Sequence, residues 1–311
     1  MTHAPEDPRS QRPAALATER VDPAFADLDD WPLGRSLAAL ADGQARAIGA
    51  VQRALPQLEA AAAGVESRLA AGGRLVYAGA GTSGRLAVQD AAELPPTFGF
   101  ERTVVLMAGG AEAGSSAREG AEDDEADAVA RVAAAAVGPA DAFIGVAASG
   151  RTPFTVAALS AARAAGAFTV GIANVEAAPL LEAAEAPVWL DSGPEVLAGS
   201  TRLAAGTAQK AALNLISTAA LVRLGGAYGN LMVGMRPLNA KLRRRAAAMV
   251  ARAAGVDEAR AAAALAVAGD DLRVAIVVAK AGVDADRARA ALDACGQRVR
   301  DALADLGVES D

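Results

Sequence analysis

Apolar side chains follow two different periods along this chain. Between Leu33 and Ala71 they recur every three or four residues in an alanine-rich background, which predicts two or three helices with a start or a kink at Pro56. From Arg74 onward, short apolar runs alternate with helical segments, and this alternation predicts a parallel sheet covered by helices on both faces. The fold class is therefore α/β, and ligands of such sheets bind beyond the carboxyl ends of the strands.

The predicted strands and helices of the sheet region alternate without interruption. The strands are expected at Leu75–Ala78, Val104–Met107, Ala142–Ala147, Thr169–Ala173 and Pro187–Leu190. The helices are expected at Leu86–Glu93, Ser116–Ala136, Pro153–Ala165, near Leu180 and at Ala205–Leu224.

The segment from Asn230 to Gln297 has a purely helical pattern. Its phrase Gly255-Val256-Asp257 returns as Gly282-Val283-Asp284, and each copy predicts a helix stop followed by an aspartate N-cap. The patterns divide the chain into an N-terminal tail with helices (1–61), an α/β domain (62–227) and a small all-α module (228–311).

Composition narrows the class of protein. The chain has 311 residues, 53% of them hydrophobic, and a formal net charge of −7, which indicates a globular protein with a sizeable core. An acidic chain repels phosphate backbones, and the short basic cluster at 241–245 is typical of a solvated helix face, so nucleic acid is disfavoured as a partner.

The few cysteine and histidine residues limit the chemistry. Cys295 is the single cysteine and His3 the single histidine, so the sequence predicts neither a disulfide nor a metal site, and any acid or base is a carboxylate, a lysine or a tyrosine. Residues 1–20 lack the pattern of a secretory signal, and no apolar run approaches a membrane span. These features predict a cytoplasmic protein that does not bind membranes.

A glycine-rich loop follows the first predicted strand. Gly79, Gly81 and Gly84 allow a backbone in which successive amides converge on an anion at the start of a helix, and Thr82 and Ser83 add hydroxyl donors. This pattern is typical of a phosphate cradle.

The same glycine spacing also fits a dinucleotide-binding fingerprint. That fingerprint needs an acidic residue at the end of the next strand to hold the ribose. Here the next strand ends in Ala108-Gly109-Gly110, and the nearest acid, Glu112, lies beyond these glycines. Nicotinamide and flavin cofactors are therefore disfavoured.

A second loop, Ser149-Gly150-Arg151-Thr152, precedes the helix expected at Pro153. One interpretation is an ordinary helix start, with Ser149 or Thr152 as the N-cap. The other is a second anion site formed by the two hydroxyls and the loop amides. The sequence leaves both open, although two such loops in one sheet favour the anion site.

Three motifs carry a resemblance to a known domain. The stretches GAGTSGR, AASGRTP and GPEVLAGSTRLAAGTAQKAALNLIST resemble the sugar isomerase (SIS) domain, a flavodoxin-like sandwich that binds phosphosugars. Within that superfamily, GAGTSGRLAVQDAAELPPTFG with EGAEDD and YGNLMV is similar to the N-acetylmuramic acid 6-phosphate etherase family, from about Thr18 to near the C-terminus. Departures from the family pattern occur at Trp31–Arg35, Asn174-Val175, Ala204 and Gly234.

The resemblance implies an enzyme of amino-sugar recycling from the cell wall. Such an enzyme cleaves the ether between D-lactate and the sugar, giving N-acetylglucosamine 6-phosphate and D-lactate without a metal or an organic cofactor. It further implies a three-helix C-terminal module that resembles a ubiquitin-associated fold. The substrate and its phosphate are expected at Thr82, Ser83, Gly84, Ser149, Gly150, Arg151, Thr152 and Ser200.

The resemblance also assigns Glu93 as the general acid and Glu122 as the general base. Glu93 precedes Pro95, which should end the helix there, and the macrodipole at a helix end favours the protonated form of an acid. Composition alone describes Glu93 as a polar helix end and Glu122 as part of a solvated acidic face.

Glu93 lies ten residues beyond Ser83, about 15 Å along one helix, so we expect a homodimer whose active site is shared between two chains.

The alternatives to the etherase function are a non-catalytic sugar-phosphate regulator and a sugar-phosphate isomerase or deaminase of the same fold. Both glutamates are present, which favours the etherase.

Overall fold

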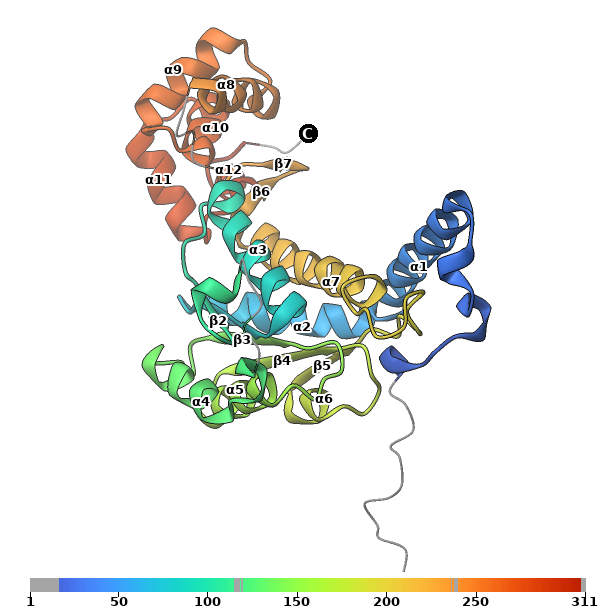
Figure 1. Ribbon diagram of the computed structural model, residues 1–311. Helices are drawn as coiled ribbons and strands as arrows, with labels where there is room; N and C mark the ends of the chain where they lie inside the picture. Colours follow the sequence, from blue (N-terminus) through green and yellow to red (C-terminus); the bar gives the residue numbers. More distant parts are fainter. Residues whose placement is uncertain (1–16, 115–117, 119, 236, 238–239, 309–311) are drawn as a thin grey trace, which may run out of the picture.

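The computed structural model describes residues 17–114, 118, 120–235, 237 and 240–308. Its centre is a parallel sheet with the strand order β2-β1-β3-β4-β5, which is the flavodoxin-like order (Figure 1). The strands are β1 (Leu75–Gly79), β2 (Thr103–Met107), β3 (Ala142–Val146), β4 (Phe168–Ala173) and β5 (Ala186–Trp189). The parallel sheet predicted from the alternation is confirmed.

Helices cover both faces of this sheet, and the strands supply side chains to each face in turn. Leu75 and Tyr77 of β1 pack into one core, whereas Val76 and Ala78 pack into the other. The first core includes α1 (Leu33–Arg53), α2 (Leu55–Ala70), α3 (Gly81–Phe98) and α7 (Ala204–Leu221). The second includes α4 (Glu125–Ala134), α5 (Pro153–Ala164) and α6 (Pro179–Ala183).

Helix α3 is longer than the sequence predicts. It continues through Pro95 and Pro96 to Phe98, so the expected end at Glu93 is wrong. The last turn is held from outside the helix, because Gly99 in the left-handed region donates its N–H to the Pro95 carbonyl and Phe98 packs against Gly226. Glu93 therefore lies more than a turn from the helix end, where the macrodipole argument no longer applies.

The acidic segment after β2 is broken into short pieces. The expected start of its helix at Ser116 lies outside the described residues, and Gly120 in the left-handed region separates η5 (Ala111–Gly114) from η6 (Ala121–Asp123). Helix α4 begins only at Glu125, after Asp124 accepts the Asp127 N–H as N-cap. The single helix expected from residue 116 is wrong, and Glu122 lies on a 3₁₀ turn.

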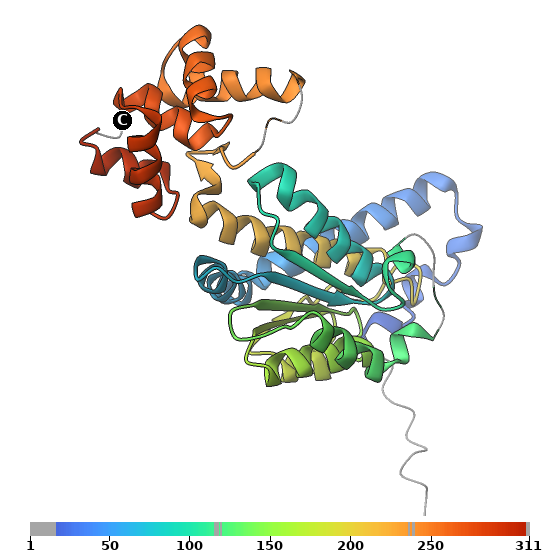
Figure 2. The same cartoon turned by 90° about the vertical axis from the view of Figure 1, so that its left-hand side faces the viewer.

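The chain ends in a group of helices with its own hydrophobic core (Figure 2). After the π-helical turn η7 (Val222–Gly226), a hairpin of β6 (Ala227–Tyr228) and β7 (Leu231–Met232) packs into that core. The described helices there are α8 (Ala240–Ala254), α9 (Glu258–Ala268), α10 (Leu272–Ala281), α11 (Ala285–Ala294) and α12 (Val299–Asp305), where the resemblance implied three.

The repeated Gly-Val-Asp phrase has the predicted geometry. Gly255 and Gly282 both have positive φ angles, and Gly282 caps the end of α10. Asp257 accepts the Arg260 N–H and Asp284 accepts the Arg287 N–H, each at 2.8 Å. Both aspartates are N-caps, as predicted.

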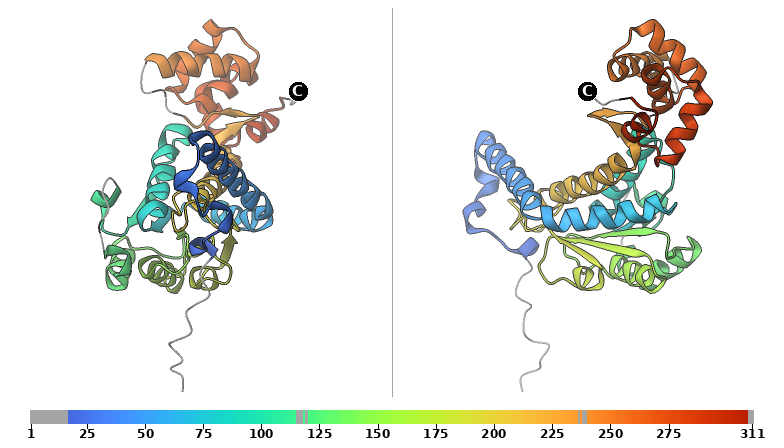
Figure 3. Two further views of the ribbon diagram at one scale, coloured as in Figure 1. Left: turned by 45° about the vertical axis from the view of Figure 1, so that its right-hand side comes forward. Right: turned by 180° about the vertical axis from the view of Figure 1, so that it is seen from behind.

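The N-terminal part contains short turns followed by a projecting helix. The turns are η2 (Ala17–Glu19), η3 (Pro23–Phe25) and η4 (Leu28–Asp30). Helix α1 packs on the sheet layer through its second half and projects beyond it with its first half (Figure 3). Helix α2 begins next to Pro56, as predicted.

A charged pair anchors the two central strands at their amino ends. Arg74 precedes β1 and Asp141 precedes β3, and the guanidinium donates to both carboxylate oxygens at 3.0 and 2.7 Å. Burial alone would raise the pKa of Asp141, but hydrogen bonds from the Arg74 side chain and from the Gly138 and Arg74 amides hold that pKa below its ordinary value.

This pair makes stability depend on pH in a defined direction. Because the folded pKa of Asp141 lies below the unfolded value of 3.8, its contribution is present above that pH and is lost as pH falls below it. Asp141→Asn is expected to lower the free energy of unfolding at pH 7 and to reduce the loss of stability on acidification. Urea titrations from pH 3 to 7 measure both effects; equal pH dependence in the two proteins would contradict this account.

Candidate active site

The two predicted loops leave the sheet at paired strand ends. In the β1–β3 pair, Gly79 lies opposite Val146, so the loops that follow them start side by side at the carboxyl edge of the sheet. In the strand order, β1 and β3 flank the point where the chain direction across the sheet reverses. Flavodoxin-like folds bind their ligands at this point.

The first loop turns tightly because two of its glycines touch. A Cβ atom on Gly84 would lie 2.7 Å from the Gly79 carbonyl oxygen and 2.3 Å from the Met107 sulfur. Helix α3 can therefore start directly above β1, and no side chain caps its first turn. Thr82 is half-buried and Ser83 buried in that turn.

Neither hydroxyl of the second loop caps helix α5. Thr152 precedes α5 but makes no side-chain cap hydrogen bond, and the Ser149 hydroxyl accepts the N–H of Arg151 at 3.2 Å within the loop. Thr152 therefore occupies the N-cap position before Pro153, as the ordinary helix start predicts, but neither hydroxyl caps the helix. Gly150 has a φ of +62°, and a Cβ there would lie 2.5 Å from that of Ala178.

The N-terminus of α7, in contrast, is already occupied. The Glu195 carboxylate, 1% exposed, accepts the N–H groups of Ala204 and Ala205 at 2.9 Å each. A carboxylate at this position satisfies the first amides and complements the helix dipole. Ser200 lies half-buried in the segment between them. Of these three helix N-termini, those of α3 and α5 have no side-chain cap.

A buried chain of amides fixes the hydroxyl of Ser83. The Ser83 Oγ donates to Gln209 Oε1 at 2.8 Å, and Gln209 Nε2 donates to Asn174 Oδ1 at 2.9 Å. Asn174 Nδ2 donates in turn to the Leu190 carbonyl at 3.0 Å. Because a carbonyl can only accept, the Asn174 NH₂ must face Leu190 and its oxygen must face Gln209. The Gln209 NH₂ then faces Asn174 and its oxygen faces Ser83, so the Ser83 hydroxyl must donate to Gln209. The Ser83 oxygen therefore faces any ligand as an acceptor only.

Glu122 lies at the same edge of the sheet as the loops. Its neighbour Ala121 packs against Gly109 just beyond β2, where an added Cβ would come within 3.3 Å. The turn η6 also contacts α5, the helix that the second loop begins. The Glu122 side chain is exposed.

Glu93 is not brought to the loops within one chain. It is exposed on α3, ten residues after Ser83, which corresponds to about 15 Å of helix. The structure therefore groups the two loops and Glu122 at the strand ends and leaves Glu93 in the second half of α3.

Most of the polar residues behind the site were not predicted from the sequence. Gln209, Glu195 and Asp90 are each at most 3% exposed. The available signal was an acidic residue within a mostly apolar helical stretch, as in Leu-Ala-Val-Gln-Asp-Ala-Ala around Asp90. Such a residue marks a buried partner, although its identity depends on tertiary packing.

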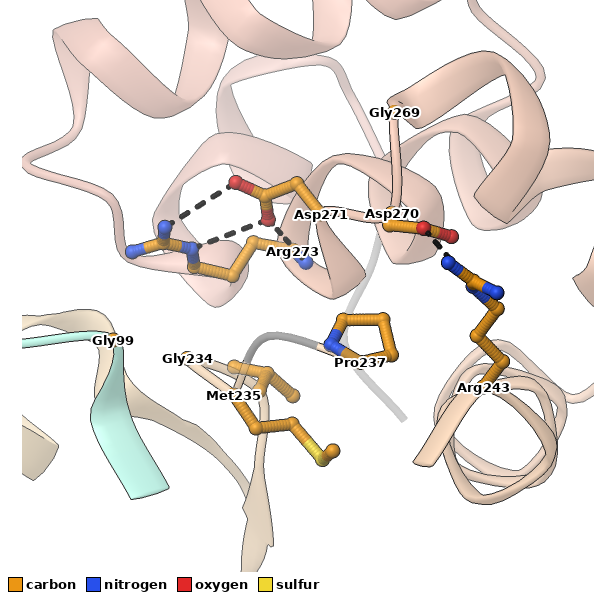
Figure 4. A pocket seen from close by; sticks show the side chains of 10 residues that line it. Gly99, Gly234, Met235, Pro237, Arg243, Gly269, Asp270, Asp271 and Arg273 are labelled. Carbon is orange, nitrogen blue, oxygen red and sulfur yellow. Dashed lines mark hydrogen bonds and ion pairs between the residues drawn. The ribbon is translucent and has the colours of Figure 1, made fainter. Parts of the chain in front are cut away.

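A pocket of about 410 Å³ lies elsewhere, between the end of α3 and the C-terminal helices (Figure 4). Its arginines are engaged with carboxylates, Arg243 with Asp270 at 3.6 Å and Arg273 with Asp271 at 3.3 Å. It is not at the carboxyl ends of the strands, where the loops lie. We therefore do not assign the substrate to it.

Over the described ranges, no group of three or more His, Cys, Asp or Glu residues is placed to hold a metal ion. His3 lies outside these ranges. Within the part of the chain that the structure describes, no helix has the length and apolarity of a membrane span.

Comparisons with known proteins agree with this geometry. The family model of the glucokinase regulatory protein N-terminal SIS domain matches residues 57–163, which include β1, the first loop, β3 and the second loop. Together with the flavodoxin-like sheet, this match defines a SIS-domain protein.

Relatives that cover most of the chain define the family within this class. An N-acetylmuramic acid 6-phosphate etherase from Deinococcus radiodurans is 55% identical over 84% of this chain and 86% of its own. Etherases of the same name from Rubrobacter xylanophilus and Streptomyces coelicolor are 48% and 45% identical, over 86% and 89% of this chain and 89% and 90% of their own. The chain therefore belongs to the N-acetylmuramic acid 6-phosphate etherase family.

Proposed function

We propose that this enzyme cleaves the D-lactyl ether of N-acetylmuramic acid 6-phosphate, giving N-acetylglucosamine 6-phosphate and D-lactate, in the recycling of cell-wall sugars. The observation that carries the proposal is the pair of uncapped helix N-termini at paired strand ends, with Glu122 at the same edge. Uncapped amides bind the phosphate, and a carboxylate within reach of the sugar supplies a base.

The proposed chemistry is an elimination followed by an addition. In the open-chain sugar C1 is an aldehyde, so loss of the C2 proton gives an enolate that expels the lactyl oxygen from C3. Glu122 takes the C2 proton, and Glu93 donates a proton to the departing oxygen. Water then adds at C3 and a proton returns to C2, so both glutamates regain their starting states.

The direct assay uses the purified protein and N-acetylmuramic acid 6-phosphate without added metal or cofactor. D-Lactate and N-acetylglucosamine 6-phosphate are expected in equal amounts. Sugar-phosphate binding without lactate release would instead support the regulator of the same fold, and conversion between aldose and ketose phosphates would support an isomerase.

The phosphate is assigned mainly to the second loop. Among the described residues, the Ser149 and Thr152 hydroxyls donate no hydrogen bond, whereas the Ser83 hydroxyl donates to Gln209. The first turn of α3 contributes the amides of Thr82, Ser83 and Gly84 and the Thr82 hydroxyl. The second loop contributes the amides of Gly150 and Arg151. Ser200 is assigned to the sugar.

Removing either hydroxyl is expected to weaken substrate binding by about 1 to 2 kcal/mol. Ser149→Ala and Thr152→Ala should therefore each raise the dissociation constant of the substrate about 5- to 30-fold. Titration calorimetry with glucosamine-type 6-phosphates measures this change, and Ser160→Ala on α5 serves as control. Unchanged affinity in the double variant would place the phosphate elsewhere.

A homodimer with a shared site is proposed for two reasons. A hexose phosphate cannot span the length of α3 between Ser83 and Glu93, so Glu93 serves a site in the partner chain. Helices α1, α2 and α7 also carry exposed large apolar side chains and a groove of about 610 Å³ between α2 and α7, which a second copy would cover. These side chains are Leu33, Leu37 and Ile48 on α1, Leu55 on α2 and Leu215 on α7, together with Val222 in η7, which follows α7.

Mixing two inactive proteins tests the shared site. Glu93→Gln subunits, exchanged with Ser149→Ala/Thr152→Ala subunits, should regain activity because each heterodimer has one intact site, about a quarter of all sites at equal mixing. Activity at low substrate concentration is compared before and after subunit exchange, which is followed by mass spectrometry. Verified exchange without recovery would place Glu93 and the loops in one chain.

The cytoplasm is the proposed compartment, as expected for a chain with one free cysteine and no partner cysteine.

A further inference from the structure

Polar contacts join α3 to α7 at two places in otherwise apolar packing. Ser83 of α3 donates to Gln209 of α7, and two helical turns later Asp90 of α3 accepts from Asn214 of α7 at 2.6 Å. Residues seven apart lie on the same face of a helix. Helix α7 therefore holds both the first turn of α3 and the turn that precedes Glu93.

The Asp90 carboxylate has an unusual environment. It is 3% exposed, and its partners are neutral donors: the Tyr77 hydroxyl at 2.7 Å, the Asn214 amide at 2.6 Å and the Ser217 hydroxyl at 3.3 Å. Burial, with the nearby Asp90 charge and hydrogen bond, raises the pKa of Tyr77 well above its ordinary value, so this phenol remains a donor. Among the described residues, Asp90 has no ion pair with an arginine or lysine.

A buried carboxylate without a cation lowers stability unless its hydrogen bonds compensate, so its presence requires a reason. Acceptor-only oxygens suit this position, because all three partners donate. The clamp formed by Asp90, Tyr77, Asn214 and Ser217 connects α3 to both β1 and α7.

The turn after Asp90 depends on this clamp more than an ordinary helical turn would. Pro95 and Pro96 have no N–H, so the carbonyls of Ala91 and Ala92 lack their usual partners in the helix. Glu93 lies within this turn, three residues after Asp90 and therefore on the adjacent part of the helix surface.

We propose that Asp90, held by Tyr77 and Asn214, is the positioning residue for Glu93. It fixes the rotation of the Glu93 turn about the axis of α3 and its position along that axis. Gln209 fixes the first turn of α3, at the phosphate loop, in the same way. The inference rests on the proposed role of Glu93 as the acid.

The test exchanges the acceptor and the donor of the clamp. Asp90→Asn places an amide opposite the Asn214 amide donor, and Asn214→Asp places a second carboxylate opposite Asp90. The double exchange again places one donor opposite one acceptor. Each single variant is expected to lower kcat by about 10- to 100-fold, with KM within about twofold, since a misplaced catalytic group has effects of this order. The double variant should recover most of the loss.

A second readout separates positioning from stability. In deuterated water, Asp90→Asn should retain C2 exchange in unreacted substrate while cleavage falls, the same signature as Glu93→Gln. Asp141→Asn, which weakens the Arg74 pair and removes no bond of the Asp90 clamp, serves as the stability control and should leave the ratio of exchange to cleavage unchanged. If Asp90→Asn does not fold, Tyr77→Phe removes one clamp bond and should shift the ratio in the same direction.

Equal loss of exchange and cleavage in Asp90→Asn, or a rise in KM alone, would overturn the inference. If Glu93→Gln itself cleaves the ether normally, the acid assignment fails instead. The two failures are therefore distinguishable.

Discussion

Glu122→Gln is expected to abolish exchange of the C2 proton and to lower kcat/KM by about 10² to 10⁴-fold, the usual contribution of a general base. Glutamine keeps the size and exposure of the side chain on η6 but cannot accept the proton. Substrate binding should change little, because the phosphate is assigned to the loops after β1 and β3. Proton NMR of the substrate in deuterated water measures the exchange directly.

Asp123→Asn is the matched control for this prediction. Asp123 is the next residue on the same 3₁₀ turn and is also exposed, so its replacement makes the same change of charge at nearly the same place. It should retain C2 exchange. Equal losses in the two variants would mean that the acidic segment acts through its charge, and Glu122 would not be the base.

Glu93→Gln is expected to stop ether cleavage while C2 exchange continues. The lactyl oxygen is a poor leaving group without a proton, so the enolate forms and returns to substrate. Lactate release should fall by about 10² to 10⁴-fold. The measurement is lactate release beside deuterium incorporation into the remaining substrate.

Glu93→Asp provides the graded comparison. It keeps an acid on α3 but shortens it by one methylene, so cleavage should be reduced less than in the glutamine variant. Loss of exchange in Glu93→Gln with retention in Glu122→Gln would reverse the two assignments.

The sheet was predictable because its inner strands β1, β3 and β4 are short, apolar and fully buried. Short apolar runs such as Ala142–Val146, alternating with helical segments, are typical of a parallel sheet covered on both faces. The two loops after β1 and β3 were predictable for a related reason, since Gly84 and Gly150 mark places where the backbone leaves no room for a Cβ.

The failures arose where tertiary packing overrides local preference. Pro95 and Pro96 should end a helix, yet Gly99 and the contact of Phe98 with Gly226 hold the last turn in place. After Gly120 in the left-handed region, the acidic chain forms a 3₁₀ turn and α4 starts only at Glu125, which the charge pattern alone does not indicate.

The polar residues behind the site were unpredictable for a different reason. Gln209 bonds Ser83 126 residues away in sequence and Asp90 bonds Asn214 124 residues away, through α3–α7 packing that no local pattern specifies. A buried acceptor becomes identifiable only when its donors are in place.

Isotopic labelling of the product by the wild-type enzyme tests the central claim most directly. In heavy-isotope water, N-acetylglucosamine 6-phosphate should contain solvent deuterium at C2 and solvent oxygen at C3, because both bonds are remade after elimination. Mass spectrometry and NMR locate the two labels. Product with an unlabelled C2, or with its original oxygen at C3, would contradict elimination followed by addition and the paired roles of Glu93 and Glu122.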